Sequence, residues 1–238
     1  MKLDYEVETR FRFNDKYEIL EIFPQLKTLN FTKLKWNTNI LSKQLFLSGK
    51  QLRISDVIVD DKTYTYLGFK KEDIGSFCNI RAEIDEQIFE LKEFGKKSII
   101  LNKLLKFAQI KNFNEIKTKD DFLRFYNLDN FLFFEGESEV ASIELVKIID
   151  KEKLLQIQKI KKNFKFDELN LLKLNLKIMY CSYLKYQLLF EVEMMADDKK
   201  QAFLFEKIIE KIVDSYNLYN LVVKKEPPIL LFEMSNNN

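Results

Sequence analysis

Charged and apolar residues alternate close to the N-terminus, in the stretch Tyr5-Glu6-Val7-Glu8-Thr9-Arg10-Phe11-Arg12. Alternate side chains of a β-strand share a face. One face would carry Glu6, Glu8, Arg10 and Arg12. The opposite face would carry Val7, Phe11 and Phe13. The pattern predicts a strand over residues 4–13 that separates a polar interior from an apolar core.

A shorter version of this pattern, Phe190-Glu191-Val192-Glu193-Met194, recurs near the C-terminus. Clustered carboxylates repel one another unless a cation joins them. A divalent metal ion together with basic side chains that hold phosphate would supply the missing charge. The alternative is a solvated sheet face whose charges form cross-strand ion pairs.

The composition excludes several kinds of catalytic site. The chain has 238 residues, 46% of them hydrophobic, which is enough for a packed core in one large or two small domains. It has no histidine, so Ser-His-Asp and Cys-His catalysis are excluded. Its two cysteines, Cys78 and Cys181, are too few for a disulfide framework or a usual zinc site, and we expect buried, inert thiols. A metal ion would therefore bind to carboxylates, as Mg²⁺, Mn²⁺ or Ca²⁺ do.

The sequence also indicates the location of the protein. The charged strand follows the first residues directly, without the pattern of a signal peptide, and no apolar run is long enough for a membrane span. We therefore expect a cytoplasmic protein with no membrane partner.

Hydrophobic periodicity gives an outline of the other elements. Strands are predicted at 51–55, 63–68 and 79–88, a strand pair around 131–134 with a turn at Gly136, two strands within 174–195, and an apolar strand at 229–232. Helices are predicted at 97–108, 150–162 and 199–216, with a short helix that Asp15 caps and Pro24 ends.

With these elements in place, the sequence resembles the CYTH superfamily, also called triphosphate tunnel metalloenzymes. Five motifs carry the resemblance, in the family's order. They are Glu6-Val-Glu8-Thr-Arg10 for the opening Glu-x-Glu-x-Lys, Leu52-Arg53-Ile54-Ser55 for Leu-Arg-Ile-Arg, Thr65 to Lys70 for the Lys-Gly hairpin strand, Arg81-Ala-Glu83-Ile-Asp85 for Arg-x-Glu-x-Glu, and Glu191-Val-Glu193 for the late Glu-Ile-Glu.

The resemblance implies an α+β fold, an antiparallel β-barrel that forms a triphosphate tunnel with helices packed outside. It implies a single domain over residues 1–238, with an insertion or elaboration within 90–170. The implied function is metal-dependent hydrolysis of a triphosphate-containing substrate, such as inorganic triphosphate or a nucleotide. Phosphoryl transfer depends on positioning and electrostatics, so the lack of histidine is no handicap.

The resemblance also assigns roles to individual residues. Glu6 and Glu8 are expected to be catalytic. The expected ligands of Mg²⁺ or Mn²⁺ are Glu6, Glu8, Glu191 and Glu193. The residues expected to contact the substrate are Arg10, Arg12, Arg53, Lys70, Arg81, Glu83 and Asp85. Arginine suits this role because its guanidinium binds phosphate oxygens in pairs.

The chain departs from the family pattern at several positions. Leu67 stands where the family has its hairpin lysine, with Lys70 as the alternative, and Ser55 replaces the second arginine of Leu-Arg-Ile-Arg. Two lysine pairs compete for one family position, Lys117/Lys119 and Lys159/Lys161. Glu144 is a rival to the late acidic strand, and we favour Glu191 and Glu193 because both acids are present there.

Two other functions fit the same residues. One is a class IV adenylyl cyclase reaction, which converts ATP to cyclic AMP and pyrophosphate. The other is a catalytically silent module that binds a triphosphate or an RNA 5′ end, which the losses at Leu67 and Ser55 favour. A purely structural role without a ligand is a further alternative. The expected partner is a triphosphate-containing small molecule, and the sequence leaves the oligomeric state open, a homodimer being one alternative.

Overall fold

A computed structural model describes residues 4–71, 73–89, 130–150, 152–153, 155–156, 171–181, 183–184 and 187–236. The chain divides into two compact units. Unit 1 consists of Met1–Lys33, Ile74–Arg81 and Glu137–Glu226. Unit 2 consists of Leu34–Asp73, Ala82–Gly136 and Pro227–Asn238. The chain passes between the units several times, so neither unit is a continuous stretch of sequence.

The strands of unit 1 lie in the order β6-β7-β8-β1-β9. They are β1 (Asp4–Phe13), β6 (Asn130–Glu144, of which residues 137–144 belong to this unit), β7 (Lys173–Cys181), β8 (Leu188–Ala196) and β9 (Val222–Val223). Strand β1 pairs with β8 and β9, and β8 pairs with β7, all antiparallel. The register places Arg10 opposite Glu191 and Glu8 opposite Glu193, so the two acidic motifs are neighbours.

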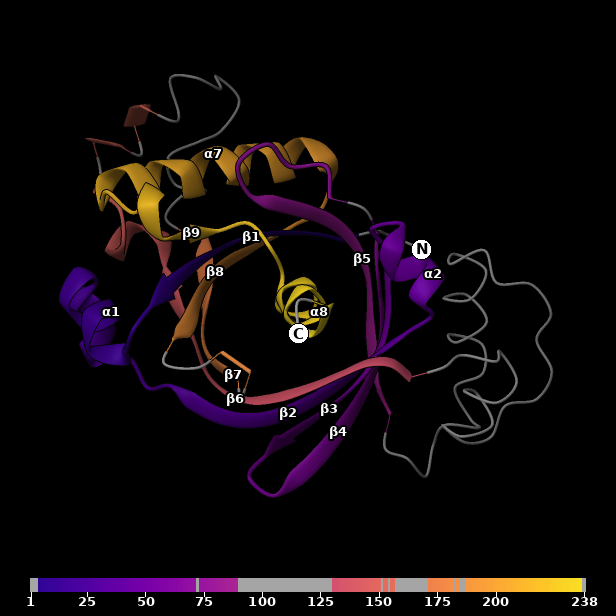
Figure 1. The fold of residues 1–238 in the computed structure, drawn as a ribbon. Helices are drawn as coiled ribbons and strands as arrows, with labels where there is room; N and C mark the ends of the chain where they lie inside the picture. Colours follow the sequence, from indigo (N-terminus) through magenta and orange to yellow (C-terminus); the bar gives the residue numbers. More distant parts are fainter. Residues whose placement is uncertain are drawn as a thin grey trace. The chain divides into compact units, whose positions relative to one another are not determined.

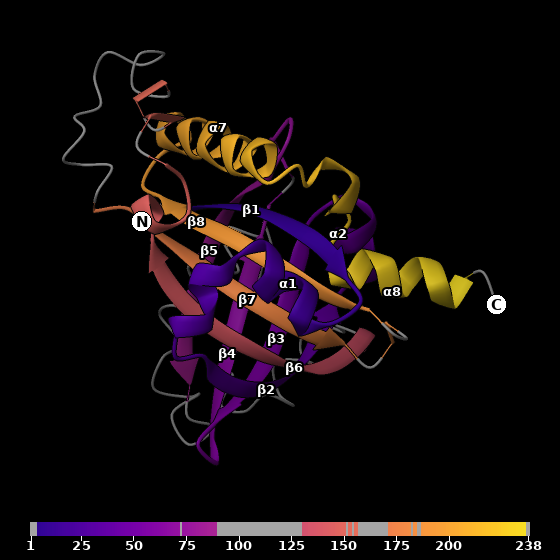
Figure 2. The same ribbon diagram turned by 90° about the vertical axis from the view of Figure 1, so that its left-hand side faces the viewer.

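One face of this sheet packs against helix α7 (Lys199–Ser215), which lies along β1 and β8 (Figures 1 and 2). Its apolar stripe is fully buried at Phe205, Ile208 and Ile209, at the spacing of a helix face. Burying each such side chain contributes about 1.5–3 kcal/mol. The sheet contributes Val7, Phe11 and Phe190 to the same core.

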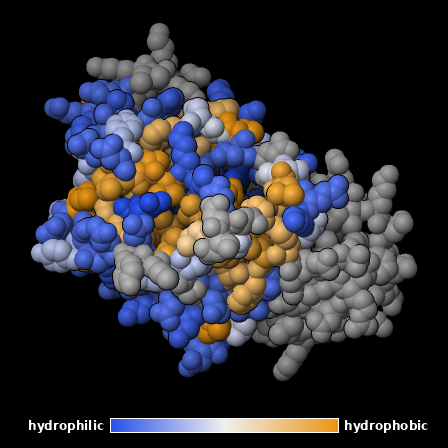
Figure 3. All heavy atoms as spheres, in the orientation of Figure 1, coloured by the Kyte–Doolittle hydropathy of each residue, from blue (hydrophilic) through white to orange (hydrophobic). Residues whose placement is uncertain are grey.

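Local signals set the ends of the helices in unit 1. Asp198 caps α7 by accepting a hydrogen bond from the Gln201 amide at 2.8 Å. The outer side of α7 carries exposed lysines and an aspartate, and the surface over this helix is largely hydrophilic (Figure 3). Helix α1 (Lys16–Ile22) begins after Asp15, which accepts from the Glu18 amide at 3.0 Å, and gives way at Pro24 to a 3-10 turn, η1 (Pro24–Thr28).

The described part of unit 1 also contains two further 3-10 turns, η3 (Leu145–Lys147) and η4 (Tyr219–Leu221). Leu145 is fully buried in the same core as α7. Turn η4 leads directly into the two residues of β9 and so brings the chain back beside β1.

Unit 2 has its strands in the order β5-β4-β3-β2-β6. They are β2 (Thr32–Leu41, from Leu34 in this unit), β3 (Gln51–Val59), β4 (Lys62–Lys70), β5 (Asn79–Phe89, from Ala82 in this unit) and the part of β6 up to Gly136. Asp60 and Asp61 join β3 to β4 with φ angles of 47° and 60°. Two positive φ angles make the tight hairpin whose twist suits antiparallel strands.

Two short helices in unit 2 share an aromatic cluster. Helix α2 (Lys43–Leu47) begins at Ser42, whose hydroxyl accepts from the Leu45 amide. Helix α8 (Pro227–Asn236) brings Phe232 to 5.5 Å from the rings of Phe46 in α2 and Phe131 in β6. Ring pairs at this separation contribute beyond their buried area.

The expected α+β class with an antiparallel sheet is confirmed. Closure into a barrel depends on how the two units are placed and stays a prediction. Helix 97–108, most of helix 150–162 and most of the expected insertion within 90–170 lie outside the described residues. Within the described part of the chain, no helix combines the length and the apolar character needed to span a membrane.

Two sequence predictions were wrong, and strands β2 and β9 were missed. Residues 131–134 do not form a strand pair with a turn at Gly136, because β6 runs through this glycine as one strand of 15 residues. Residues 229–232 lie in helix α8 instead of a strand. Strand β2 was not predicted, although Leu34, Trp36 and Ile40 alternate with Lys35, Asn37 and Asn39 as in a strand.

Candidate functional site

A buried charged cluster lies on the face of β1 opposite the α7 core. Glu6, Glu8 and Arg10 are 8%, 1% and 3% exposed, respectively, although they are charged. Placing an ion in such surroundings is costly unless it is paired and hydrogen-bonded. The alternation of β1 therefore separates an apolar face from a face that is buried and ionic, as the sequence predicted.

Arg10 is at the centre of the cluster. Its Nη2 lies 2.5 Å from Oε1 of Glu8, and its Nε lies 2.7 Å from Oε2 of Glu191. Burial by itself would lower the pKa of Arg10, but Glu8, Glu191, Glu226 and Glu6 outweigh that effect and hold the pKa well above its ordinary value. Arg10 thus stays charged and joins the acidic motif of β1 to that of β8.

Arg81, the last residue of β5 in unit 1, forms the second cationic centre. Its Nη1 makes an ion pair with Oε1 of Glu226, the residue before α8. The same Glu226 oxygen lies 3.9 Å from Nη2 of Arg10, so one carboxylate faces two guanidiniums. Burial opposes the charge of Arg81, but the charge and hydrogen bond of Glu226 raise its pKa overall.

Strand β7 extends the polar face beyond β8. Lys177 lies opposite Glu191 in the register, and Asn175 lies opposite Glu193. The Asn175 amide donates to Glu193 at 3.3 Å, and the Ser142 hydroxyl donates to the Asn175 carbonyl oxygen at 3.0 Å. Glu193 is half-buried, whereas Glu191 is 4% exposed.

The buried centre of the polar face carries more acid than base. Among the described residues, its buried carboxylates belong to Glu6, Glu8, Glu191 and Glu226. Its buried cations are Arg10 and Arg81. Four negative charges against two positive charges leave an excess of two negative charges on these six residues, and Lys177 and Arg12 add positive charge at the edge of the face. This balance suits a divalent cation and hard oxygen ligands.

Cys181 borders the cluster. Burial raises the pKa of its thiol, although Tyr183, Lys177 and Arg10 act in the opposite direction. A thiol with a raised pKa stays protonated at neutral pH and is a poor nucleophile. Burial and the neighbouring Cys181 also raise the pKa of Tyr183. The expectation of a buried thiol at Cys181 is confirmed, and the same holds for Cys78.

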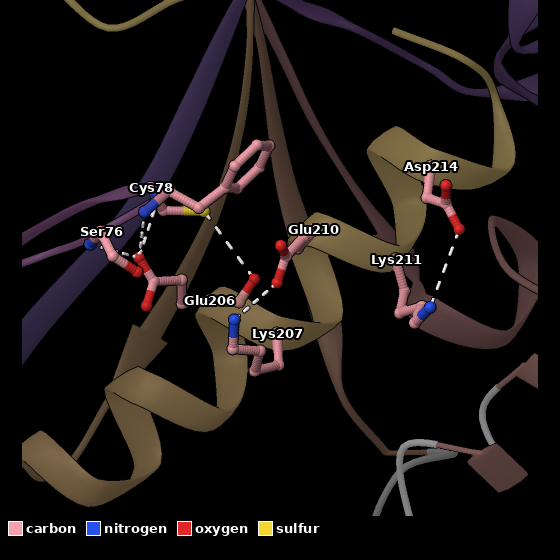
Figure 4. A network of polar contacts seen from close by, with 8 residues as sticks. Ser76, Cys78, Glu206, Lys207, Glu210, Lys211 and Asp214 are labelled. Atoms are coloured by element: carbon pink, nitrogen blue, oxygen red, sulfur yellow. Dashed lines mark hydrogen bonds and ion pairs between the residues drawn. The ribbon is translucent and has the colours of Figure 1, made fainter. Parts of the chain in front are cut away.

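A second buried carboxylate positions the strand that carries Arg81. Glu206 of α7 is 2% exposed, and its Oε1 accepts from the amides of Ser76 and Phe77 at 2.7 Å and of Cys78 at 3.1 Å (Figure 4). Strand β5 begins at the next residue. A side chain at Gly75 would bring Cβ to 1.8 Å from the Cys78 carbonyl oxygen, so this loop requires glycine there. The loop fixes the direction in which β5 starts.

Unit 2 carries two more of the basic residues that the sequence selected, Arg53 and Lys70. Gln51 pairs with Lys70 and Arg53 with Gly68, so Arg53 and Lys70 share one face of the β3–β4 hairpin. Lys70 is 4% exposed and Arg53 is half-buried. Leu67 pairs with Ile54, out of phase with Arg53. In this register, position 70 lies on the same face of the hairpin as Arg53, and position 67 does not.

The structure brings together five of the predicted site residues in unit 1: Glu6, Glu8, Arg10, Arg81 and Glu191. Glu193 lies beside them, and Arg12 is exposed at the end of β1. The side chains of Glu83 and Asp85 lie outside the described part of the chain, as do the pairs Lys117/Lys119 and Lys159/Lys161. Glu144, the rival acid, is 49% exposed and pairs with Lys147.

Sequence reasoning missed Glu226 and Lys177. Glu226 belongs to no strand pattern, and its nearest signal is the pair Pro227-Pro228, which is typical of a helix start. Lys177 alternates with the apolar residues of β7, a signal that could have placed it on the polar face.

Comparisons with known proteins show the fold. The PH1819 protein from Pyrococcus horikoshii has a TM-score of 0.60 at 14% identity, with 97% of this chain and 99% of that chain covered. A putative adenylate cyclase from Vibrio parahaemolyticus has a TM-score of 0.53 at 10% identity, covering 96% and 98%. A Hippeastrum protein, described as a putative adenylyl cyclase with a dominant triphosphatase activity, has a TM-score of 0.48 at 10% identity, covering 98% and 96%. No family model and no curated protein matches the sequence.

Proposed function

We propose that this chain is a CYTH-type protein that binds a triphosphate-containing molecule through the buried polar face of unit 1 and hydrolyses it with a divalent metal. The observation that carries the proposal is the pair of buried guanidiniums, Arg10 and Arg81, set among carboxylates on one sheet face. Replacing a buried ion pair by an apolar pair of similar size is often neutral or stabilising, so stability alone is weak grounds for this cluster and a functional site is a candidate explanation for it. The fold shared with a putative adenylate cyclase agrees with this proposal.

The guanidiniums suit a phosphate chain. Each presents donors in a planar fork that matches two phosphate oxygens, and each stays charged at every physiological pH. In this proposal Arg10 and Arg81 contact the phosphates from unit 1. Arg12, Arg53, Lys70, Glu83 and Asp85 stay as further candidates from the sequence.

The carboxylates suit Mg²⁺ or Mn²⁺ in their chemistry and charge. In the described residues no three acidic or thiol side chains are gathered in an arrangement that would hold a metal ion. Glu8 and Glu191 instead both bond Arg10. The metal would therefore bind when Arg10 releases one of them, with Glu6 and Glu193 as the other ligands. When bound, the metal ion neutralises charge on the phosphate oxygens.

Hydrolysis and cyclisation would use the same residues. A water molecule that attacks the terminal phosphorus yields orthophosphate, whereas a ribose hydroxyl that attacks the α-phosphorus yields pyrophosphate and a cyclic nucleotide. The silent binding module is the second candidate, and one observation favours it. Ser55 of β3 has its hydroxyl 2.8 Å from that of Thr38, so a neutral hydrogen-bonded pair occupies the place of the family's second arginine.

The test is a panel of substrates with every product identified. The purified protein is incubated with inorganic triphosphate, ATP, GTP, thiamine triphosphate and a 5′-triphosphorylated RNA, in Mg²⁺ and in Mn²⁺ separately. Orthophosphate release that Glu6→Ala and Glu8→Gln abolish supports the proposal. Cyclic nucleotide with pyrophosphate supports the cyclase. Binding without turnover in either metal supports the silent module and contradicts hydrolysis.

A further inference from the structure

Glu226 is a buried acid that occupies both cationic centres of the proposed site. Its carboxyl oxygen pairs with Nη1 of Arg81 and lies 3.9 Å from Nη2 of Arg10, and the residue is 2% exposed. A carboxylate oxygen and a phosphate oxygen are the same kind of partner for a guanidinium. Glu226 thus occupies a donor of Arg81 that a phosphate group would need, and it faces Arg10 by charge at a distance longer than a hydrogen bond.

We infer that Glu226 is a built-in competitor of the ligand: a phosphate group binds Arg81 and Arg10 by displacing this carboxylate, which releases the segment around it. The inference rests on the proposed function, because it assumes that these two arginines bind phosphate. It adds a residue that the sequence motifs did not contain and a conformational consequence of binding.

Electrostatics favour displacement over joint occupancy. A phosphate group beside the Glu226 carboxylate would place like charges together in a buried site, where their repulsion is weakly screened. A terminal phosphate carries about two negative charges at neutral pH and a carboxylate carries one. The phosphate is therefore the stronger partner for the two guanidiniums, and the carboxylate is the group that leaves.

The chain around Glu226 allows it to leave. Strand β9 is two residues long and ends at Val223, and helix α8 begins at Pro227. The two lysines between β9 and Glu226, Lys224 and Lys225, are exposed. The ammonium of Lys224 reaches the Ser76 carbonyl oxygen at 3.4 Å, a long hydrogen bond. Displacing Glu226 thus disturbs a short connection and leaves the α7 core unchanged.

The first test compares ligand affinity. Inorganic triphosphate is titrated calorimetrically into wild-type protein, Glu226→Gln and the control Glu144→Gln, in EDTA so that metal-dependent hydrolysis does not run. Glu226→Gln should bind about tenfold more tightly than wild type, because removing a charge-assisted bond of the competitor is worth on the order of one power of ten. Glu144→Gln removes an exposed acid on β6 and should bind like wild type.

The second test needs no variant and covers the case in which Glu226→Gln fails to fold. Trypsin cleavage after Lys224 and Lys225 of the wild-type protein is timed by mass spectrometry, with and without inorganic triphosphate. Cleavage after Lys62, the exposed first residue of β4, is the internal reference. Saturating ligand should speed cleavage at Lys224 and Lys225 severalfold and leave Lys62 unchanged.

The outcomes separate the inference from the proposed function. Equal or weaker binding by Glu226→Gln, or cleavage at Lys224 and Lys225 that the ligand does not speed, overturns the inference while the substrate panel still decides the function. Weaker binding by the variant would mean that Glu226 positions the arginines for the ligand. No binding by either protein overturns the inference as well.

Discussion

At the scale of single residues, the polar face of unit 1 is held together by multiple partners for each charge. Arg10 bonds Glu8 and Glu191, and Glu226 faces Arg10 and Arg81. Removing one member of such a set leaves a buried charge without its partner. The free energy of unfolding then falls by more than the intact ion pair contributes to it. The sequence could predict which residues share a face, because alternation sets that. It could not predict Glu226, whose position depends on where β9 ends.

Arg10→Met tests this coupling through stability. The substitution leaves two carboxylates buried without their main cation, so we expect the free energy of unfolding to fall by about 3–5 kcal/mol. Urea denaturation at neutral pH measures it. The matched control is Arg12→Met, an exposed arginine on the same face of β1, which should change the free energy by about 0.5 kcal/mol or less. Equal losses in the two variants would contradict the account.

A tyrosine on the opposite face of the sheet gives a pH-dependent prediction. Burial and the neighbouring Glu139 raise the pKa of Tyr180 from 10.0 to about 12. Because the folded pKa lies above the unfolded one, the stability that this residue contributes is complete below about pH 10 and is lost as the pH rises toward 12.

Carbon-13 NMR of protein labelled at the tyrosine Cζ measures the ionisation of Tyr180, with Tyr180→Phe to assign its resonance. The Tyr180 signal should stay at the phenol position up to about pH 11, where an exposed tyrosine is already ionised. A midpoint near pH 10 for Tyr180 would contradict the contact with Glu139.

At the scale of elements, α7 supports the site at a distance by fixing the start of β5. Glu206 binds three consecutive amides with one oxygen, and Gly75 permits the close turn that presents them. The amphipathic pattern predicted α7 well. The same pattern places Glu206 on the buried side of the helix, which is a signal of a buried polar partner that could have been noticed.

Glu206→Gln tests that support. The amide side chain keeps the volume but loses the charge that three amides share, so we expect a loss of about 1–3 kcal/mol in the free energy of unfolding. Hydrogen exchange of the amides of Ser76, Phe77 and Cys78 should become faster. The control is Glu210→Gln, one turn along α7, whose partner is the exposed Lys207. Unchanged exchange in the Glu206 variant would show that the loop is held by other contacts.

Most strands whose residues alternate were predicted, with β2 as an exception, and two elements whose local signals conflict were predicted wrongly. Strand β6 contains Gly136, a residue type that is common in turns. The residues before and after this glycine belong to the same strand, so β6 continues through it. Helix α8 contains a short apolar run that suits a strand or a helix equally, and Pro227 at its first position favours the helix.

At the scale of the whole molecule, each sequence motif is a short continuous stretch, whereas each unit is assembled from three separate stretches of the chain. Unit 1 combines the first strand, eight residues before and within β5, and most of the C-terminal half. No pattern in a single sequence shows that Arg81 of β5 meets Glu226, which is 145 positions away. The α+β class and the antiparallel sheet follow from alternation and order, whereas a closed tunnel depends on the placement of the two units.

The most direct test of the central claim is a crystal structure with Mn²⁺ and inorganic triphosphate, collected at a wavelength that gives anomalous signal from manganese. We predict a manganese peak next to carboxylate oxygens of β1 and β8, with phosphate oxygens on the guanidiniums of Arg10 and Arg81. The same structure would give the placement of the two units. Triphosphate bound elsewhere, or these arginines still bonded to Glu8, Glu191 and Glu226 with saturating ligand, would contradict the account.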